Sequence, residues 1–152
     1  MKKLVLVSVA AAALCGAAYA QRPDAAATIQ ARQGNYKQMA SALRGISDQL
    51  RSGSPDLGQI RPRAALLADR SVQVLRWFPR GTGPEAGVRT RAKPDIWSNH
   101  EAFRHAGATF VVAARNLNGA AQAGDLARIR TALPAVQRAC SGCHDIFRAP
   151  EH

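Results

Sequence analysis

The spacing of apolar residues is the feature that most constrains the fold of this chain. Between residues 24 and 147 apolar side chains recur at steps of three and four residues, the period of one face of an α-helix. No segment of comparable length shows the alternation of apolar and polar residues that is typical of a β-strand. The pattern predicts an all-α domain, and four segments of helical period favour a four-helix bundle.

The first two helices are delimited by turn-forming residues. A helix is predicted over residues 24–50, and the Ser-Gly-Ser-Pro-Asp sequence that follows reads as a turn. A second helix is predicted over residues 57–78. Pro62 is compatible with this helix because it falls within its first turns.

The third helix follows a long irregular segment, residues 79–94, that is rich in glycine and proline. Loops of this length in a compact domain are commonly functional. Asp95 or Ser98 can cap the helix, and Ser98 with Glu101 has the spacing of a capping box.

The last helix has a favourable N-cap in Asp125 and extends to Phe147. Pro134 falls inside it. A proline in a helix interior removes one hydrogen bond and clashes with the preceding turn, so we expect a kink or a break there, with a regular segment over residues 135–147.

Residues 1–20 have the pattern of a secretory signal peptide, in which two lysines precede an apolar run and small residues end in Ala-Tyr-Ala. The apolar run is too short to indicate a membrane anchor. We therefore expect cleavage between Ala20 and Gln21, a periplasmic protein, and one domain over residues 21–152.

The chain is strongly basic, with 21 Lys and Arg against 10 Asp and Glu and a formal net charge of +11. Two of the lysines fall in the signal, which leaves 19 basic residues on the mature chain. The arginines are spread along the sequence with little aromatic interleaving, so nucleic-acid binding is not indicated. Attraction to acidic partners and neutralisation of an anionic cofactor are favoured instead.

The sequence Cys-Ser-Gly-Cys-His carries the chemistry of the chain. On a helix, Cys140, Cys143 and His144 lie at i, i+3 and i+4 on one face, so all three can contact one flat ligand. C-x-x-C-H is the attachment pattern of c-type haem, in which the two thiols form thioethers with the vinyl groups and the imidazole binds the iron. The motif predicts one covalent haem c, with His144 as the proximal iron ligand.

Two other chemistries use closely spaced cysteines. A thiol-disulfide oxidoreductase normally places C-x-x-C at the start of a helix after a strand, whereas this pair falls late in a predicted helix. A zinc site needs a fourth ligand, and His100 and His105, which could supply one, are better interpreted as surface or interhelix residues. The exported oxidoreductase is kept as the alternative from a different functional class.

The whole mature chain resembles the cytochrome c prime family, the class II c-type cytochromes. The resemblance rests on four segments in order: Arg32–Gln33, residues 78–82 (FPRGT), residues 92–98 (AKPDIWS) and residues 140–148 (CSGCHDIFR). It implies an antiparallel four-helix bundle of up-down-up-down topology with one haem c.

The resemblance also assigns residues to the distal side of the haem. Arg32 and Gln33 would lie over the haem, with Arg32 near a propionate, which a guanidinium can bind through two charge-assisted hydrogen bonds. Tyr36 matches the position that holds an uncoordinated residue in high-spin members, whose iron is five-coordinate. Thr82 and Glu85 would contact the haem edge, although relatives often carry the acidic residue directly after the Gly-Thr pair.

Met39 is the alternative sixth ligand. Arg32, Tyr36 and Met39 lie at i, i+4 and i+7, a single stripe that can face the haem. In low-spin relatives a methionine of this helix binds the iron, whereas a methionine on an apolar stripe is more often a packing residue. We expect five-coordinate iron, with a low-spin electron-transfer cytochrome as the alternative.

These features imply a cytochrome, and not an enzyme, that acts in electron transfer, in binding of NO or CO, or in both. An apolar distal face would exclude water and anions while admitting uncharged diatomic gases. Redox proteins are the expected partners, and the resemblance implies a homodimer that packs through the first two helices. Trp77 and Trp97 are interpreted as core anchors.

Overall fold

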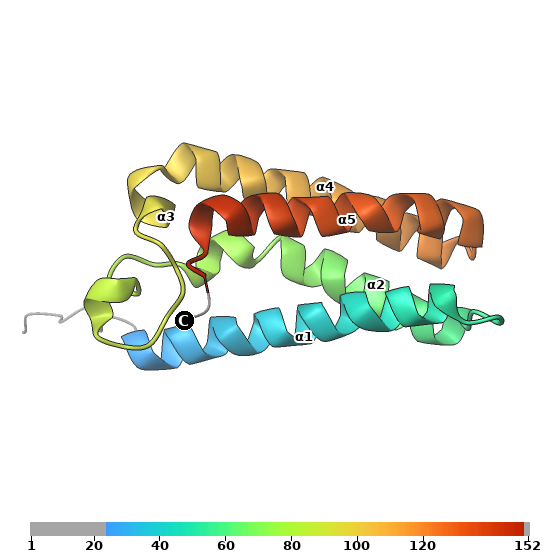
Figure 1. Ribbon diagram of the computed structural model, residues 1–152, viewed down its shortest axis with the longest axis horizontal. Helices are drawn as coiled ribbons and strands as arrows, with labels where there is room; N and C mark the ends of the chain where they lie inside the picture. The colour runs from blue at the N-terminus through green and yellow to red at the C-terminus, as the bar shows by residue number, and fades with distance from the viewer. Residues whose placement is uncertain (1–23, 151–152) are drawn as a thin grey trace, which may run out of the picture.

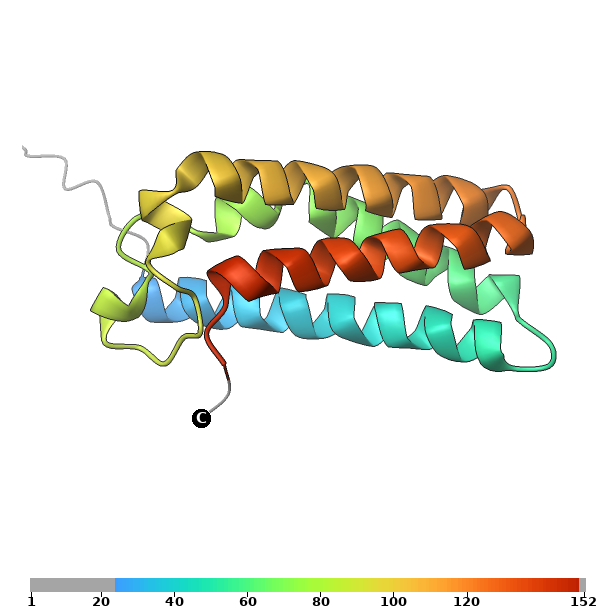
Figure 2. The same ribbon diagram turned by 45° about the horizontal axis from the view of Figure 1, so that its top comes forward.

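Four long helices form an antiparallel bundle in the computed structural model, which describes residues 24–150. They are α1 (Ala25–Arg51), α2 (Leu57–Ser71), α4 (His100–Gln122) and α5 (Leu126–Phe147), and successive helices run in opposite directions along the long axis (Figures 1 and 2). The predicted four-helix bundle is confirmed. The signal peptide and its cleavage site lie outside the described residues.

Side-chain caps set the starts of α1 and α5. The Asp24 carboxylate accepts hydrogen bonds from the backbone N–H groups of Ala26 and Ala27. The Asp125 carboxylate accepts one from the N–H of Arg128 at 2.9 Å, so this residue caps the last helix as predicted.

The start of the third long helix differs from the prediction. Asp95 to Ser98 form a separate single-turn helix, α3 (Asp95–Ser98), and α4 is capped by Asn99, whose side chain accepts a hydrogen bond from the N–H of Ala102. The expected capping box is wrong, because the Ser98 hydroxyl donates to the Pro94 carbonyl instead. An asparagine serves equally well as an N-cap, and a cap one residue later lets the chain turn between α3 and α4.

The second helix is shorter than predicted. It ends at Ser71, and residues 74–77 form a turn of 3-10 helix, η1 (Val74–Trp77). After Arg70 the backbone changes to bonds between residues three apart, with the N–H of Gln73 donating to the Arg70 carbonyl. Two β-branched residues, Val72 and Val74, fall at this change and weaken helix propensity there.

Helix α5 passes through Pro134 without the expected break. Leu133 and Val136, on either side of the proline, are both buried. Their burial stabilises the helix on both sides of the missing hydrogen bond, which explains why tertiary packing overrides the local cost of the proline.

The core has an aliphatic part and an aromatic part. Apart from Thr82, the largest fully buried side chains are aliphatic: Ile29, Ile46, Ile60, Leu67, Leu117, Ile129 and Val136. The aromatic part consists of edge-to-face or tilted pairs that join Tyr36, Trp77, Phe78, Trp97, Phe103 and Phe147. Both tryptophans belong to it, and the indole N–H of Trp97 donates to the Phe78 and Pro79 carbonyls.

The segment between η1 and α3 crosses one end of the bundle, beside the start of α1 and the end of α5 (Figure 1). It contains one 3-10 turn, η2 (Pro84–Ala86), which ends at Gly87 with a φ of 68°, a left-handed conformation that glycine adopts without strain. This segment positions several residues of the site described next. Within residues 24–150, no helix has the length and apolar character needed to cross a membrane.

Candidate haem-binding site

A cavity of about 470 Å³ lies between α1, α4 and α5 at the end of the bundle that the segment crosses. Its walls are mostly apolar, with Leu43 from α1, Phe103 and Phe110 from α4, and Phe147 from α5. A volume of this size lies in the range of cofactor and ligand sites.

Helix α5 contributes the three residues of the C-x-x-C-H motif to this cavity. Cys140, Cys143 and His144 all line it, as their shared helix face predicts. Both thiols are free and partly buried. Burial raises the pKa of Cys140 and raises that of Cys143 to about 11, with the negative charge of Cys140 contributing to the second shift. Both thiols are therefore protonated at neutral pH.

His144 lies at the rim, where part of its surface faces solvent and the rest lines the cavity. Its pKa is below the ordinary value, mainly because of burial and also because Arg148 and Arg91 repel a positive imidazolium. The neutral imidazole is favoured, and this is the form that binds a metal. His100 and His105 are exposed on α4 and do not line the cavity.

Helix α1 contributes Gln33, Tyr36 and Met39 to the lining. The ring of Tyr36 packs edge-to-face on Trp77, with 5.4 Å between the ring centroids. Burial raises the pKa of its phenol well above the ordinary value, so the hydroxyl stays neutral. Met39 is only 6% exposed and belongs to the hydrophobic core.

Arg32 is a buried cation in the cavity wall, with 3% of its surface exposed. Nη1 donates to the Thr82 hydroxyl at 2.9 Å, and Nη2 donates to the Thr82 carbonyl at 2.7 Å and to the Thr90 hydroxyl at 2.8 Å. The guanidinium also lies 4.6 Å from the centroid of the Phe78 ring. Its two terminal nitrogens are therefore engaged by the segment that crosses the bundle end.

Thr82 and Glu85 do not line the cavity. Thr82 is 1% exposed, and its hydroxyl donates to the Pro79 carbonyl while it accepts from Arg32. A Glu85 carboxylate oxygen accepts a hydrogen bond from the N–H of Gly83 at 3.1 Å. Thr82 therefore supports Arg32 by direct hydrogen bonds. Burial lowers the pKa of Arg32, and Glu85 acts on it through its negative charge, which opposes that larger lowering.

Several lining residues were not predicted to belong to the site. Thr90, Arg91 and Ala92 line the cavity from the crossing segment, and Lys37 and Arg148 line it from α1 and the end of α5. Ala92 and Arg148 fall in segments that carry the family resemblance, whereas Thr90 has no such signal, and its hydroxyl accepts from Arg32, 58 residues earlier in the chain. The basic character of the segment was visible in the sequence, but its position was not.

The residues present fit a covalently bound haem. Two thiols and a neutral imidazole lie on one wall, and the other walls are apolar enough for a porphyrin. Arg32, Lys37, Arg91 and Arg148 line the same cavity and can neutralise the two propionates. The donor set and the lining therefore agree with the cofactor that the C-x-x-C-H motif predicts.

Fold and site together define a c-type cytochrome of the four-helix-bundle class. The Cytochrome C' family matches residues 27–148, and the chain belongs to this family. It is 33% identical over 150 residues to the cytochrome c' of Rhodospirillum rubrum, covering 98% of this chain and 99% of the relative. It is 32% identical over 129 residues to the cytochrome c' of Rubrivivax gelatinosus, covering 84% of this chain and 97% of the relative.

Solved structures of the family superpose on the whole bundle. The crystal structure of cytochrome c' from Rubrivivax gelatinosus matches with a TM-score of 0.76 at 30% identity and covers 84% of this chain and 99% of that chain. A nitric oxide complex of a cytochrome c prime variant from Alcaligenes xylosoxidans matches with a TM-score of 0.76 at 27% identity, with 86% and 100% of the two chains covered.

Proposed function

We propose that this protein is a periplasmic monohaem cytochrome that binds NO or CO and exchanges electrons with redox proteins. The observation that carries the proposal is the convergence of Cys140, Cys143 and His144 on an apolar cavity whose α1 side is formed by Tyr36 and Met39. Haem supplies an iron that changes between ferric and ferrous states and binds diatomic gases. The signal-peptide pattern of residues 1–20 supports export.

In this proposal the α5 residues hold the cofactor. Each cysteine S–H would add across one haem vinyl group, so that the sulfurs of Cys140 and Cys143 form thioethers and no free thiol remains. The neutral imidazole of His144 would bind the iron. Arg91, Arg148 and the remaining N–H groups of Arg32 attract the propionates.

The α1 residues that face the cavity would offer the iron of a bound haem no ligand. The Tyr36 phenol is neutral and its ring is held by Trp77, while Met39 packs in the core. This supports five-coordinate iron that accepts small uncharged gases. Structures of family members with bound nitric oxide and with bound carbon monoxide support gas binding as the function. Ligation by Met39 would instead give a low-spin electron-transfer protein.

The thiol-disulfide alternative is disfavoured by the position of the cysteines. Cys140 and Cys143 lie near the C-terminal end of α5, where the helix dipole is negative and opposes a thiolate. A reactive dithiol needs the opposite environment, such as a helix N-terminus.

We further propose that the protein forms a homodimer through α1 and α2. One similar structure, a cytochrome c' with a TM-score of 0.76 at 27% identity, is described as showing ligand-controlled dimer dissociation. Sedimentation of the ferrous protein with and without carbon monoxide measures the association. A monomer at micromolar concentration in both states would contradict the dimer.

Covalent haem is the first test of the proposed function. The full chain, produced with a cytochrome c maturation system, should retain haem on a denaturing gel, and Cys140→Ala/Cys143→Ala should retain none. Thr131→Val is a matched control, because this exposed residue bonds only within its own helix. A wild-type protein without covalent haem would overturn the cytochrome assignment.

The optical spectrum is the second test. Five-coordinate ferrous iron gives a broad, unsplit band in the visible region and binds added carbon monoxide. A sharp, split α band without carbon monoxide would contradict the five-coordinate site and identify a protein ligand such as Met39. His144→Ala tests the proximal ligand, since an unchanged spectrum would mean that another residue binds the iron.

A further inference from the structure

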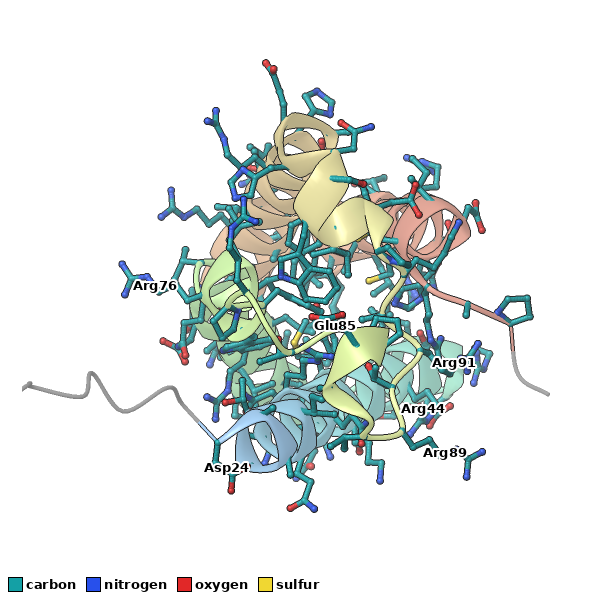
Figure 3. The ribbon with its side chains drawn as sticks, turned by 90° about the vertical axis from the view of Figure 1, so that its left-hand side faces the viewer. Asp24, Arg44, Arg76, Glu85, Arg89 and Arg91 are labelled. Atoms are coloured by element: carbon teal, nitrogen blue, oxygen red, sulfur yellow. The ribbon has the colours of Figure 1, made fainter. Side chains whose placement is uncertain are left out.

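Residues 89–93, here called the strap, join two walls of the cavity that come from opposite ends of the sequence. Figure 3 shows the segment that carries Glu85, Arg89 and Arg91 crossing the end of the bundle between α1 and the end of α5. Three strap residues, Thr90, Arg91 and Ala92, line the cavity. The strap is therefore part of the binding site as well as a connection between helices.

On one side the strap is bonded to α1. Nη2 of Arg32 donates to the Thr90 hydroxyl at 2.8 Å, and the side-chain amide of Gln33 donates to the Arg89 carbonyl at 3.1 Å. Arg32 is almost fully buried, so loss of the Thr90 hydroxyl leaves one N–H of its guanidinium without a partner away from water, while the bonds to Thr82 remain. The Arg32–Thr90 bond is thus the costlier of the two to break.

On the other side the strap is bonded to the end of α5. The N–H of Lys93 donates to the Phe147 carbonyl at 3.0 Å, and the N–H of Ala149 donates to the Arg91 carbonyl at 2.8 Å. Nε of Arg91 also donates to the Ala149 carbonyl at 2.7 Å. Phe147 follows His144 by less than one helical turn, so these bonds fix the end of the helix that carries the motif.

Thr90 links the bonds to α1 with the bonds to the end of α5. Its hydroxyl accepts from Arg32 and also from the N–H of Ala92 at 3.2 Å, which orders the strap directly before the residues that pair with the α5 end. A serine retains this oxygen and a valine of similar shape does not. The chemistry of the hydroxyl, and not its volume, is the feature that can be tested.

We propose that Thr90 is a positioning residue that, through Arg32, fixes the separation of α1 from the end of α5 and so limits the size of ligand that reaches the iron. The part concerning the iron rests on the proposed haem function. Tyr36 and His144 lie on the two elements that the strap joins. If the strap loses hydrogen bonds and becomes more mobile, these two elements can move apart and the space between Tyr36 and His144 widens. The wider space should raise the association rate of larger uncharged ligands more than that of carbon monoxide.

Amide hydrogen exchange tests the strap without using ligand binding. In the haem-loaded protein, Thr90→Val should lower the protection of the Lys93 and Ala149 amides by about tenfold, the effect of losing one hydrogen bond to a charged group. Neither amide is bonded to the Thr90 hydroxyl, so a change there reports coupling along the strap. Thr90→Ser should restore protection to within about twofold of wild type, and Thr131→Val should leave it unchanged.

Ligand kinetics test the consequence for selectivity. Flash photolysis of the ferrous protein gives association rates for carbon monoxide and for tert-butyl isocyanide, two uncharged ligands of different size. Thr90→Val should raise the isocyanide rate about tenfold and change the carbon monoxide rate by less than about twofold, with reversal in Thr90→Ser. The ratio of the two rates is the decisive quantity, because general destabilisation does not reverse with serine.

Two outcomes would overturn the proposal. One is unchanged protection of Lys93 and Ala149 in Thr90→Val, and the other is an unchanged ratio of rates despite lowered protection. Failure of the wild-type protein to bind carbon monoxide would refute the gas-binding function and the selectivity together, whereas the exchange result would still decide whether Thr90 holds the strap. If Thr90→Val does not fold, Thr90→Ala takes its place in both measurements.

Discussion

Arg32 shows how a residue that lines a site can be held in place by the protein itself. The family resemblance implies that its guanidinium lies near a haem propionate. In the structure its terminal nitrogens donate to Thr82 and Thr90. Both N–H groups of Nη2 are used, so a carboxylate that bound both terminal nitrogens would have to displace Thr82 or Thr90 from Nη2. In the proposed haem complex the charge of Arg32 would therefore act on a propionate from a fixed position.

Met39 gives a direct prediction at the same scale. Because its side chain is buried in the core, Met39→Leu should leave the ferric and ferrous optical spectra unchanged and lower stability by less than about 1.5 kcal/mol. Spectra before and after addition of carbon monoxide, together with a denaturant titration, measure both effects. Conversion of a low-spin spectrum into a high-spin one by this substitution would identify Met39 as the ligand.

The protonation state of Tyr36 gives a second prediction. Burial raises the pKa of its phenol above the ordinary value of 10.0, so the neutral form persists through the pH at which an exposed tyrosine ionises. The ferric protein should therefore show no charge-transfer band of an iron-bound phenolate up to about pH 10. Tyr36→Phe is the control and should titrate in the same way. A band that appears with rising pH in wild type only would contradict this.

At the scale of elements, Asn99 and Ser98 are the two candidate N-cap residues of α4, and the structure distinguishes between them. Asn99 accepts a hydrogen bond from the Ala102 N–H, whereas the Ser98 hydroxyl bonds back to Pro94. Asn99→Ala should cost about 1 kcal/mol of unfolding free energy, and Ser98→Ala should cost less than about 0.5 kcal/mol. Denaturant unfolding of the two variants provides the comparison. A larger loss of unfolding free energy in Ser98→Ala than in Asn99→Ala would support the capping box of Ser98 and Glu101 instead.

The elements were predictable to the extent that local sequence determines them. Apolar period identified α1 closely, and period together with the N-cap Asp125, which acts on the first turn of its own helix, identified α5. The end of α2 and the continuity of α5 through Pro134 were not predictable, because each depends on what the helix packs against. Propensity is a weak guide wherever burial opposes it.

The site also has residues that local sequence identifies and residues that only the folded structure brings together. The motif residues were identifiable because Cys140, Cys143 and His144 lie at i, i+3 and i+4 on one face of a helix. Thr90 was not, since its contact with Arg32 joins residues 58 positions apart. The resemblance identifies Thr82 as a site residue, but its hydrogen bonds to Arg32 are a property of the folded segment and not of the motif.

At the scale of the whole molecule, charge is the property that bears on partners. Residues 21–152 have 19 Lys and Arg against 10 Asp and Glu, a formal net charge of +9, and Lys37, Arg91 and Arg148 line the cavity. Long-range electrostatic attraction raises the association rate of an acidic protein with such a surface, and dissolved salt screens that attraction. If the proposed redox partners are acidic proteins, the basic residues at the cavity would attract them before any close contact forms.

Electron transfer with an acidic redox protein should consequently depend on ionic strength. The second-order rate of reduction should fall at least about tenfold between about 10 mM and 200 mM salt, whereas reduction by a small neutral reductant should change by less than about twofold. Stopped-flow reduction of the ferric protein measures both rates. Lys37→Gln should weaken the salt dependence, because this residue lines the cavity and has none of the hydrogen bonds that hold the strap. Equal salt dependence for the two reductants would show that charge steering is not what brings partners to the haem.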